Sequence, residues 1–265
     1  MLLRLIWAAL LAGAGIAILV RRSLGWWGAG ATCFFRTPEG LTPDQVARLE
    51  RTLAARRAAE GSAVPWRRSV GILAILLAIV ELIPAVPFAI PYALFCLGLA
   101  ASELICFSGM RRAVHRRAAA LVPRSPLQAI PPFLYLTVGA AFTGVVLASP
   151  GMHPLVVIVI AVATAILAWI AWQIAAGRAL LLGDDPKMEY AVDERLRVLR
   201  VTNMATLACA PATALVASSI PFVADSYRRS SDVASWIAEA ALLAAVLGAF
   251  VIARRSAVKF ERDIA

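Results

Sequence analysis

The sequence predicts an all-α protein: a polytopic integral membrane helical bundle of about seven transmembrane segments, with the N-terminus outside and the C-terminus in the cytoplasm. Two observations lead to this class. Of the 265 residues, 61% are hydrophobic and the mean hydropathy is +0.80, whereas a soluble domain averages roughly 45–50% apolar residues. The basic residues also fall almost entirely into alternate gaps between apolar segments, as the positive-inside rule describes.

Seven apolar stretches are candidates for crossing the bilayer, which takes about 20 helical residues. They have almost no polar face, so we expect their excess apolar surface to meet lipid. The stretches are Leu5–Val20, Val70–Val86, Phe88–Phe107, Pro132–Ala148, Pro154–Ala176, Val201–Val223 and Val233–Ala253. We treat residues 1–265 as one membrane domain, because the polar piece at residues 21–68 is too small for a core of its own.

The distribution of Lys and Arg predicts the orientation. Of 26 such residues, 23 lie in residues 21–68, 110–131 and 177–200 and in the tail after Ala253, which we assign to the cytoplasm. The net charge of +10 suits contact with anionic lipid headgroups on that side. Basic residues scattered through short loops argue against nucleic acid as a partner. The preference for Arg over Lys, with much alanine, suggests a bacterial inner membrane protein.

The first apolar stretch has a second interpretation, a cleaved signal peptide, because Arg4 precedes it and small residues occur at Ala12–Ala14. Arg21 and Arg22 follow at once and resist export, so a membrane helix is the preferred interpretation.

Small residues at a spacing of four predict two surfaces where another helix could pack closely. One comprises Ala9, Gly13 and Ala17. The other, in the last helix, comprises Ala241, Ala245 and Ala249 with Ala244 and Gly248.

Residues 42–60 predict an amphipathic helix in the cytoplasmic segment. Thr42 is the expected N-cap, Pro43 the first helical residue and Gln45 the end of a capping box. An apolar stripe that includes Leu49 and Leu53 runs along one face of this helix, and arginines cover much of the rest. One hypothesis places this helix on the inner leaflet, with Arg48, Arg51, Arg56, Arg57, Trp26, Trp27 and Trp66 at the membrane surface; the other packs it on the protein's own loops.

Three prolines, Pro84, Pro87 and Pro91, break the helix within residues 81–91. The arginine pairs Arg67-Arg68 and Arg111-Arg112 flank this region, and both are assigned to the cytoplasm. The chain must then enter and leave the membrane on the same side, so residues 70–107 are expected to form a helical hairpin. Two full spans need about 40 residues, which this region barely has. A re-entrant hairpin therefore remains the alternative.

Intramembrane acids are candidates for function because charge is costly there. Glu81, Glu103 and Glu239 are the three in the apolar stretches. One hypothesis uses Glu81 and Glu239 in a proton or cation path; the other treats all three as hydrogen-bonded structural residues.

The sixth apolar stretch contains Pro211, which frees the carbonyl of Leu207 and predicts a kink. Asn203 and nearby threonines add polar groups. Transporters use such broken helices to coordinate ions, but proline also serves shape alone in membrane helices.

No catalytic motif is present, so we expect a protein that is not an enzyme and has no cofactor. Two histidines and four cysteines without a CxxC spacing give no basis for a metal site. Asp184 and Asp185 are expected to begin a short helix at Lys187–Arg200.

Three functional hypotheses follow. The first is a non-catalytic subunit or assembly partner that packs against other membrane proteins. The second is a transporter or channel for a small solute or ion, using Glu81, Glu239 and the Pro211 helix. The third, an intramembrane enzyme, has no matching motif.

Overall fold

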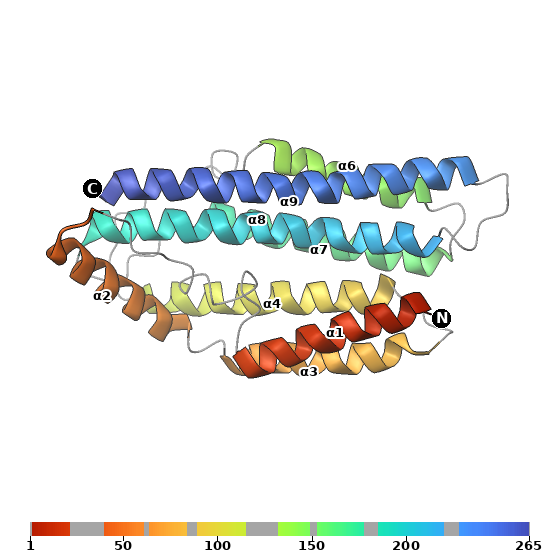
Figure 1. Cartoon of the computed structure of the whole chain (residues 1–265), viewed down its shortest axis with the longest axis horizontal. Helices are drawn as coiled ribbons and strands as arrows, with labels where there is room; N and C mark the ends of the chain where they lie inside the picture. Colours follow the sequence, from red (N-terminus) through yellow and green to blue (C-terminus); the bar gives the residue numbers. More distant parts are fainter. Residues whose placement is uncertain are drawn as a thin grey trace.

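A computed structural model describes residues 2–21, 40–60, 64–83, 89–114, 132–148, 153–177, 185–219 and 228–264. This part of the chain forms eight helices and contains no strand. Most of these helices run along one long axis as an elongated bundle, and one helix lies obliquely at the end that carries the C-terminus (Figure 1). The two termini lie at opposite ends of the bundle. The predicted all-α class is confirmed for the described residues.

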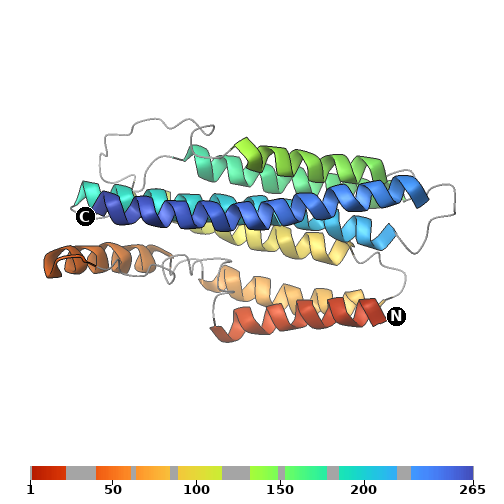
Figure 2. The same cartoon turned by 45° about the horizontal axis from the view of Figure 1, so that its top comes forward.

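Three helices of the first half form one side of the bundle (Figure 2). These are α1 (Leu2–Arg21), α3 (Val64–Glu81) and α4 (Ala89–Val114), and α3 packs on both of the others. At the end of α3, the Ile83 N–H donates to the Val80 carbonyl at 3.0 Å. The next described residue is Ala89, so the turn that would distinguish a spanning from a re-entrant hairpin lies outside the described residues.

The second half contributes α6 (Pro132–Ala148), α7 (Pro154–Ala176), α8 (Pro186–Ser219) and α9 (Arg228–Ile264). The sequence predicts the bounds of α6 and α7 correctly, because both begin at a proline, whose fixed φ and missing N–H suit the first helical position. Before α7, His153 Nδ1 accepts a hydrogen bond from the Leu155 N–H at 3.3 Å. Helix α8 packs against α4, α6, α7 and α9 and so lies at the centre of the bundle.

Two helices are much longer than the bilayer requires. α8 has 34 residues and α9 has 37; at 1.5 Å per residue each is about 50 Å long, against about 30 Å of hydrocarbon. The prediction of a separate short helix at Lys187–Arg200 is wrong, because that segment is the first half of α8. No proline or glycine falls between Lys187 and Pro211 to end it. The helix also continues through Pro211, whose side chain is buried.

Helices α1 and α3 meet at two glycines. A Cβ on Gly15 would lie 2.7 Å from the Gly71 carbonyl oxygen, and one on Gly71 would lie 2.9 Å from Leu19 Cγ. The contact at Gly15 admits only glycine without a shift of the backbone, and the contact at Gly71 would force the Leu19 side chain to move. A Cβ on Gly13 would meet nothing within 4 Å, so the predicted Ala9 and Gly13 stripe is not the surface that packs on α3.

Two described helical stretches are long and apolar enough to cross a membrane: Ala89–Ser108 and Pro154–Ala176. Leu5–Val20 and Leu134–Leu147 are apolar but shorter. These stretches are compatible with a membrane protein, but they do not establish the predicted arrangement of seven spans.

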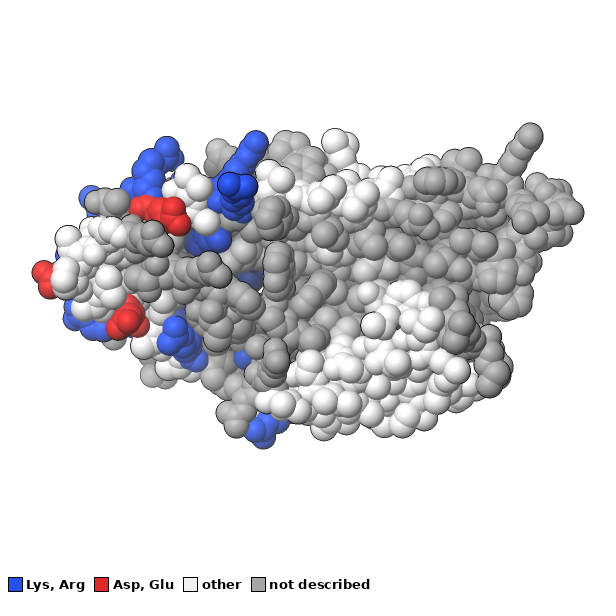
Figure 3. All heavy atoms as spheres, viewed as in Figure 1, with Lys and Arg blue, Asp and Glu red and all other residues white. Residues whose placement is uncertain are grey.

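Charge and apolar surface separate along the molecule. In the view of Figure 3, the described Lys, Arg, Asp and Glu side chains gather toward the end that carries α2 (Pro43–Glu60) and the C-terminus. Large apolar side chains are exposed on the outer faces of the other helices, for example Val20 at 75%, Leu136 at 72% and Leu155 at 64%.

Candidate functional site: a buried ionic network at the charged end

Helix α2 docks on the charged end of the bundle through its apolar stripe. Leu49 and Leu53 are buried in a cluster with Leu196 of α8 and with Phe260 and Ile264 of α9. Three helices, α2, the first half of α8 and the last turns of α9, thus form a small charged head with its own core. The stripe is covered by the protein itself, as in the second hypothesis, but its partners are helices α8 and α9 and not the expected loops.

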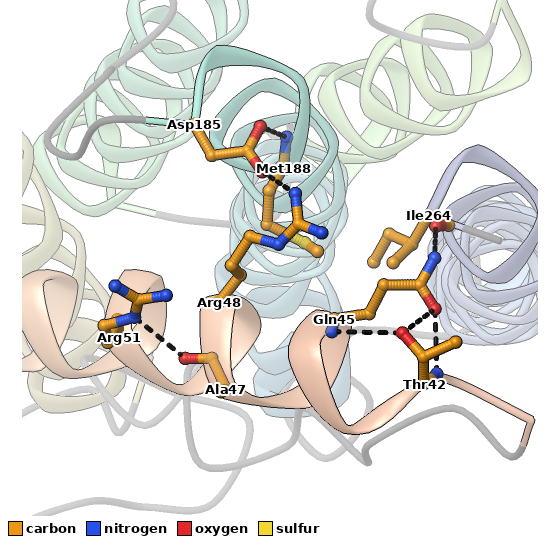
Figure 4. Close-up of polar contacts among 8 residues, drawn as sticks. All are labelled: Thr42, Gln45, Ala47, Arg48, Arg51, Asp185, Met188 and Ile264. Carbon is orange, nitrogen blue, oxygen red and sulfur yellow. Dashed lines mark hydrogen bonds and ion pairs between the residues drawn. The ribbon is translucent and has the colours of Figure 1, made fainter.

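The start of α2 is built as predicted and adds a second tie. The Thr42 N–H donates to Gln45 Oε1 at 2.9 Å, and the Gln45 N–H donates to Thr42 Oγ1 at 3.4 Å, which completes the capping box. Gln45 Nε2 also donates to the Ile264 carbonyl at 3.0 Å (Figure 4). The first turn of α2 is therefore bonded to the end of α9.

Arg56 is the centre of the network. Its side chain is 0% exposed; Nη1 lies 3.2 Å from Asp193 Oδ1, and Nη2 lies 3.7 Å from Glu189 Oε2. Nη2 also donates to the Glu189 carbonyl at 3.3 Å. The prediction that Arg56 lies at the membrane surface is wrong, because α8 supplies two buried carboxylates on the side where α2 docks.

The network continues along α8 toward the bundle. Asp193 Oδ2 lies 2.8 Å from Nη2 of Arg197, one turn further along the helix. Arg197 Nη1 donates to the Ala175 carbonyl at 3.4 Å. Ala175 is in the last turn of α7, where carbonyls lack helical donors and carry partial negative charge, so a cation is well placed there.

A further ion pair joins α8 to α4. Arg200 Nε lies 3.5 Å from Glu103 Oε2, and both side chains are 5% exposed. Nearby on α4, the Cys106 sulfur accepts a hydrogen bond from Arg67 Nη2 of α3 at 3.7 Å. Glu103 is therefore a paired structural carboxylate rather than a free acid in the membrane.

The four α8 residues Glu189, Asp193, Arg197 and Arg200 recur at spacings of four, four and three, which places them on one helical face. This spacing is the signal that sequence reasoning missed. Burying these charges is costly, so the network needs all its partners present, and removing one leaves an uncompensated charge. The arrangement can hold α2, α4, α7 and α8 in one fixed geometry.

Arg195 lies on another face of α8 and is half-buried. Burial lowers its pKa, and the nearby Glu261 carboxylate of α9 opposes that shift. This pair adds an electrostatic contact between the two long helices of the head.

The other predicted surface residues lie nearer to solvent. Arg48 Nη1 is 3.4 Å from Asp185 Oδ2, and Arg51 Nε donates to the Ala47 carbonyl at 3.3 Å. Arg57 is exposed, and Trp66 is 54% exposed. Trp26 and Trp27 lie outside the described residues. Asp185 caps α8 through Oδ1, which accepts from the Met188 N–H at 3.2 Å, as predicted; Asp184 lies outside the described residues.

The predicted intramembrane residues do not come together in the described part. Glu81 is 1% exposed at the end of α3, whereas Glu103 lies 14 residues into α4, about 20 Å along the helix. Asn203 is half-buried on α8. The side chain of Glu239 lies outside the described residues. Between the level of Glu81 and the level of Glu103, α3 and α4 pack through apolar residues such as Ala74, Leu77, Leu99 and Ala100.

Within the described residues, no three His, Cys, Asp or Glu side chains group so as to hold a metal ion. Two residues of the predicted small surface of α9 are used inside the fold: Ala241 and Ala245 are buried in a cluster with Ala141 and Val145 of α6. Ala244 is exposed, and the side chain of Ala249 lies outside the described residues. Comparison with protein-family models, with curated proteins and with solved structures finds no match to this chain.

Proposed function

We propose that this chain is a non-catalytic multi-pass protein of a bacterial inner membrane that acts as a subunit or assembly partner of a larger membrane complex. In this proposal seven segments cross the bilayer, the N-terminus is outside and the charged head lies in the cytoplasm. The positive-inside distribution and the grouping of charge at one end support this orientation.

The outer face of α1 is the observation that carries the proposal. Ala9 and Gly13 are exposed, nothing within 4 Å would meet a Cβ on Gly13, and α1 already packs on α3 through Gly15. Small residues spaced by four let membrane helices approach closely. This stripe therefore suits a partner helix, whereas Ala241 and Ala245 of the similar stripe on α9 are already buried against α6.

The test is purification from the native host in mild detergent, with the molecular mass and composition of the particle measured. We expect a particle larger than one chain, and we expect Gly13→Leu to release the chain from it. Gly139→Leu is the control, because a Cβ on Gly139 of α6 also meets nothing within 4 Å. A monomeric parent protein, or equal loss in both variants, would contradict this surface.

Orientation is tested by labelling with a membrane-impermeant thiol reagent. A cysteine at Ser230 should react from outside intact cells, and a cysteine at the exposed Glu261 of α9 should not. Labelling of the Glu261 position from outside would reverse the proposed topology.

A proton or cation transporter is the second candidate, favoured by the burial of Glu81 within an apolar helix end. A carboxylate there must be neutral, paired or beside water. In liposomes, Glu81→Gln should abolish flux if the acid carries ions and leave the protein folded. Absence of flux in the parent protein, or unchanged flux in the variant, supports the structural role that we favour.

A further inference from the structure

A cavity of about 330 Å³ lies between α6, α7 and α8. It forms because α6 and α7 each pack closely on α8 but touch each other far less. Ala168 and Ala171 of α7 and Ala205 of α8 line the wedge, and their short side chains leave it unfilled. Tyr135 and Trp172 form its aromatic side, with ring centroids 6.2 Å apart.

The lining favours an apolar occupant. The Tyr135 hydroxyl and the Trp172 indole N–H are the side-chain polar groups of the lining, and the other six lining side chains are apolar. Most of the surface therefore offers no partner to water, which needs two to four. The volume falls within the roughly 300–1,000 Å³ of ligand pockets. Trp172 is 39% exposed, so the cavity is reached from the outer surface of the bundle.

Charged side chains lie one helical turn beyond one end of the cavity. Arg197 is one turn before the lining residue Val201 on α8, and it donates to the Ala175 carbonyl, one turn beyond the lining residue Ala171 on α7. Arg197 is already paired with Asp193 at this level, so the net positive charge comes from the predicted cytoplasmic segments, which hold 23 of the 26 Lys and Arg residues against 16 Asp and Glu in the whole chain. An amphiphile seated here would place its chain in the wedge and its head beside net positive charge.

We propose that this cavity binds an acyl chain of an anionic phospholipid from the cytoplasmic leaflet. The inference rests on the proposed membrane location. The chain enters from the side between α6 and α7, and the phosphate lies at the level of Arg197, where the fold changes from apolar to charged.

The test uses the full chain, purified in detergent and stripped of lipid, with thermal unfolding measured as phosphatidylglycerol or phosphatidylcholine is added. A ligand that binds the folded state raises the unfolding temperature. Ala168→Leu fills the cavity; Ala165→Leu is its matched control, on an exposed position one turn away. We expect the parent and the control to respond saturably, and Ala168→Leu to need about tenfold more phosphatidylglycerol.

A second measurement covers the case in which Ala168→Leu does not fold. Phosphatidylglycerol with brominated chains, present as a minor lipid in vesicles, should quench Trp172 more than Trp169, which is 54% exposed on the outer face of α7. The two contributions are obtained by difference from Trp172→Phe and Trp169→Phe. Equal quenching of both, or equal lipid responses of Ala168→Leu and the parent, would overturn the proposal.

Two further outcomes separate its parts. An equal response to phosphatidylcholine and phosphatidylglycerol would overturn the anionic headgroup while leaving the acyl-chain site. A chain that stays in solution when vesicles are floated would instead overturn the proposed membrane location itself.

Discussion

The charged head and the α1–α3 pair solve the problem of helix association in opposite ways. In the head, α2 is held by buried ion pairs, with Arg56 reaching Glu189 and Asp193. In the α1–α3 pair, backbones approach at Gly15 and Gly71 with no charged group between them. The first depends on complete charge compensation, and the second depends on the absence of a side chain.

The difference follows from the physical requirement of each interface. Buried charges are costly unless each has its partner, so the head tolerates one geometry of α2. A glycine contact gains close van der Waals packing and tolerates any partner that brings backbone within reach. Single substitutions should therefore act very differently in the two regions.

Asp193→Ala should have the largest effect. It removes a partner from both Arg56 and Arg197, and leaving buried cations uncompensated costs about 3–5 kcal/mol. Thermal unfolding in detergent measures the loss, and trypsin cleavage within α2 reports its release. Asp263→Ala, at an exposed position of α9, should change stability by less than about 0.5 kcal/mol. Protected α2 in Asp193→Ala would show that the network does not hold it.

Leu49→Ala should come next. Leu49 is 1% exposed between α8 and α9, and truncating a buried leucine costs about 2–5 kcal/mol. The same two measurements apply, with Val258→Ala as the control because Val258 is 61% exposed on α9. Equal sensitivity of the two variants would mean that the apolar stripe of α2 is not seated as described.

Sequence reasoning predicts the local features of this fold better than its long-range pairings. Proline starts fix α6 and α7, and the Thr42–Gln45 capping box forms as expected, because each depends on neighbours in the chain. The docking of α2 was left between two hypotheses, since Gln45 and its partner Ile264 are 219 positions apart. An apolar stripe indicates that one face of a helix is buried, but it does not identify the surface against which that face packs.

The site was the harder part for a related reason. Arg56 reads as one more surface arginine until the spacing of Glu189 and Asp193 on α8 is considered together with it. Glu103 reads as an isolated membrane acid until Arg200 is brought beside it from a distant segment. Which charges pair across a large sequence separation can be inferred only once the order of the helices in the bundle is known.

Gly15→Ala should have an intermediate effect. The added Cβ would lie 2.7 Å from the Gly71 carbonyl oxygen and 2.8 Å from Ile75 Cγ1, and such overpacking costs about 1–3 kcal/mol. Gly13→Ala is matched in substitution and helix, with nothing within 4 Å, and should be neutral or slightly stabilising because alanine favours helix. Thermal unfolding of the monomer in detergent compares them. A larger loss for Gly13→Ala would reverse the assignment of the two faces of α1.

The smallest effect concerns Asp185, where the head meets solvent. One carboxylate oxygen caps α8 at the Met188 N–H, and the other pairs with Arg48 at 3.4 Å (Figure 4). Because the Arg48 side chain is 49% exposed, the pair should contribute no more than about 1 kcal/mol, whereas losing an N-cap costs about 0.5–2 kcal/mol.

Asp185→Asn separates the two contributions, because asparagine keeps a capping oxygen and loses the charge. We expect Asp185→Asn and Arg48→Ala each to cost a few tenths of a kcal/mol, and that cost to fall at high salt, where exposed charges are screened. Asp185→Ala should cost more than either, and its extra cost should not depend on salt. Unfolding temperatures at low and high ionic strength measure both terms. A salt-independent cost in Arg48→Ala would mean that this surface pair belongs to the buried network after all.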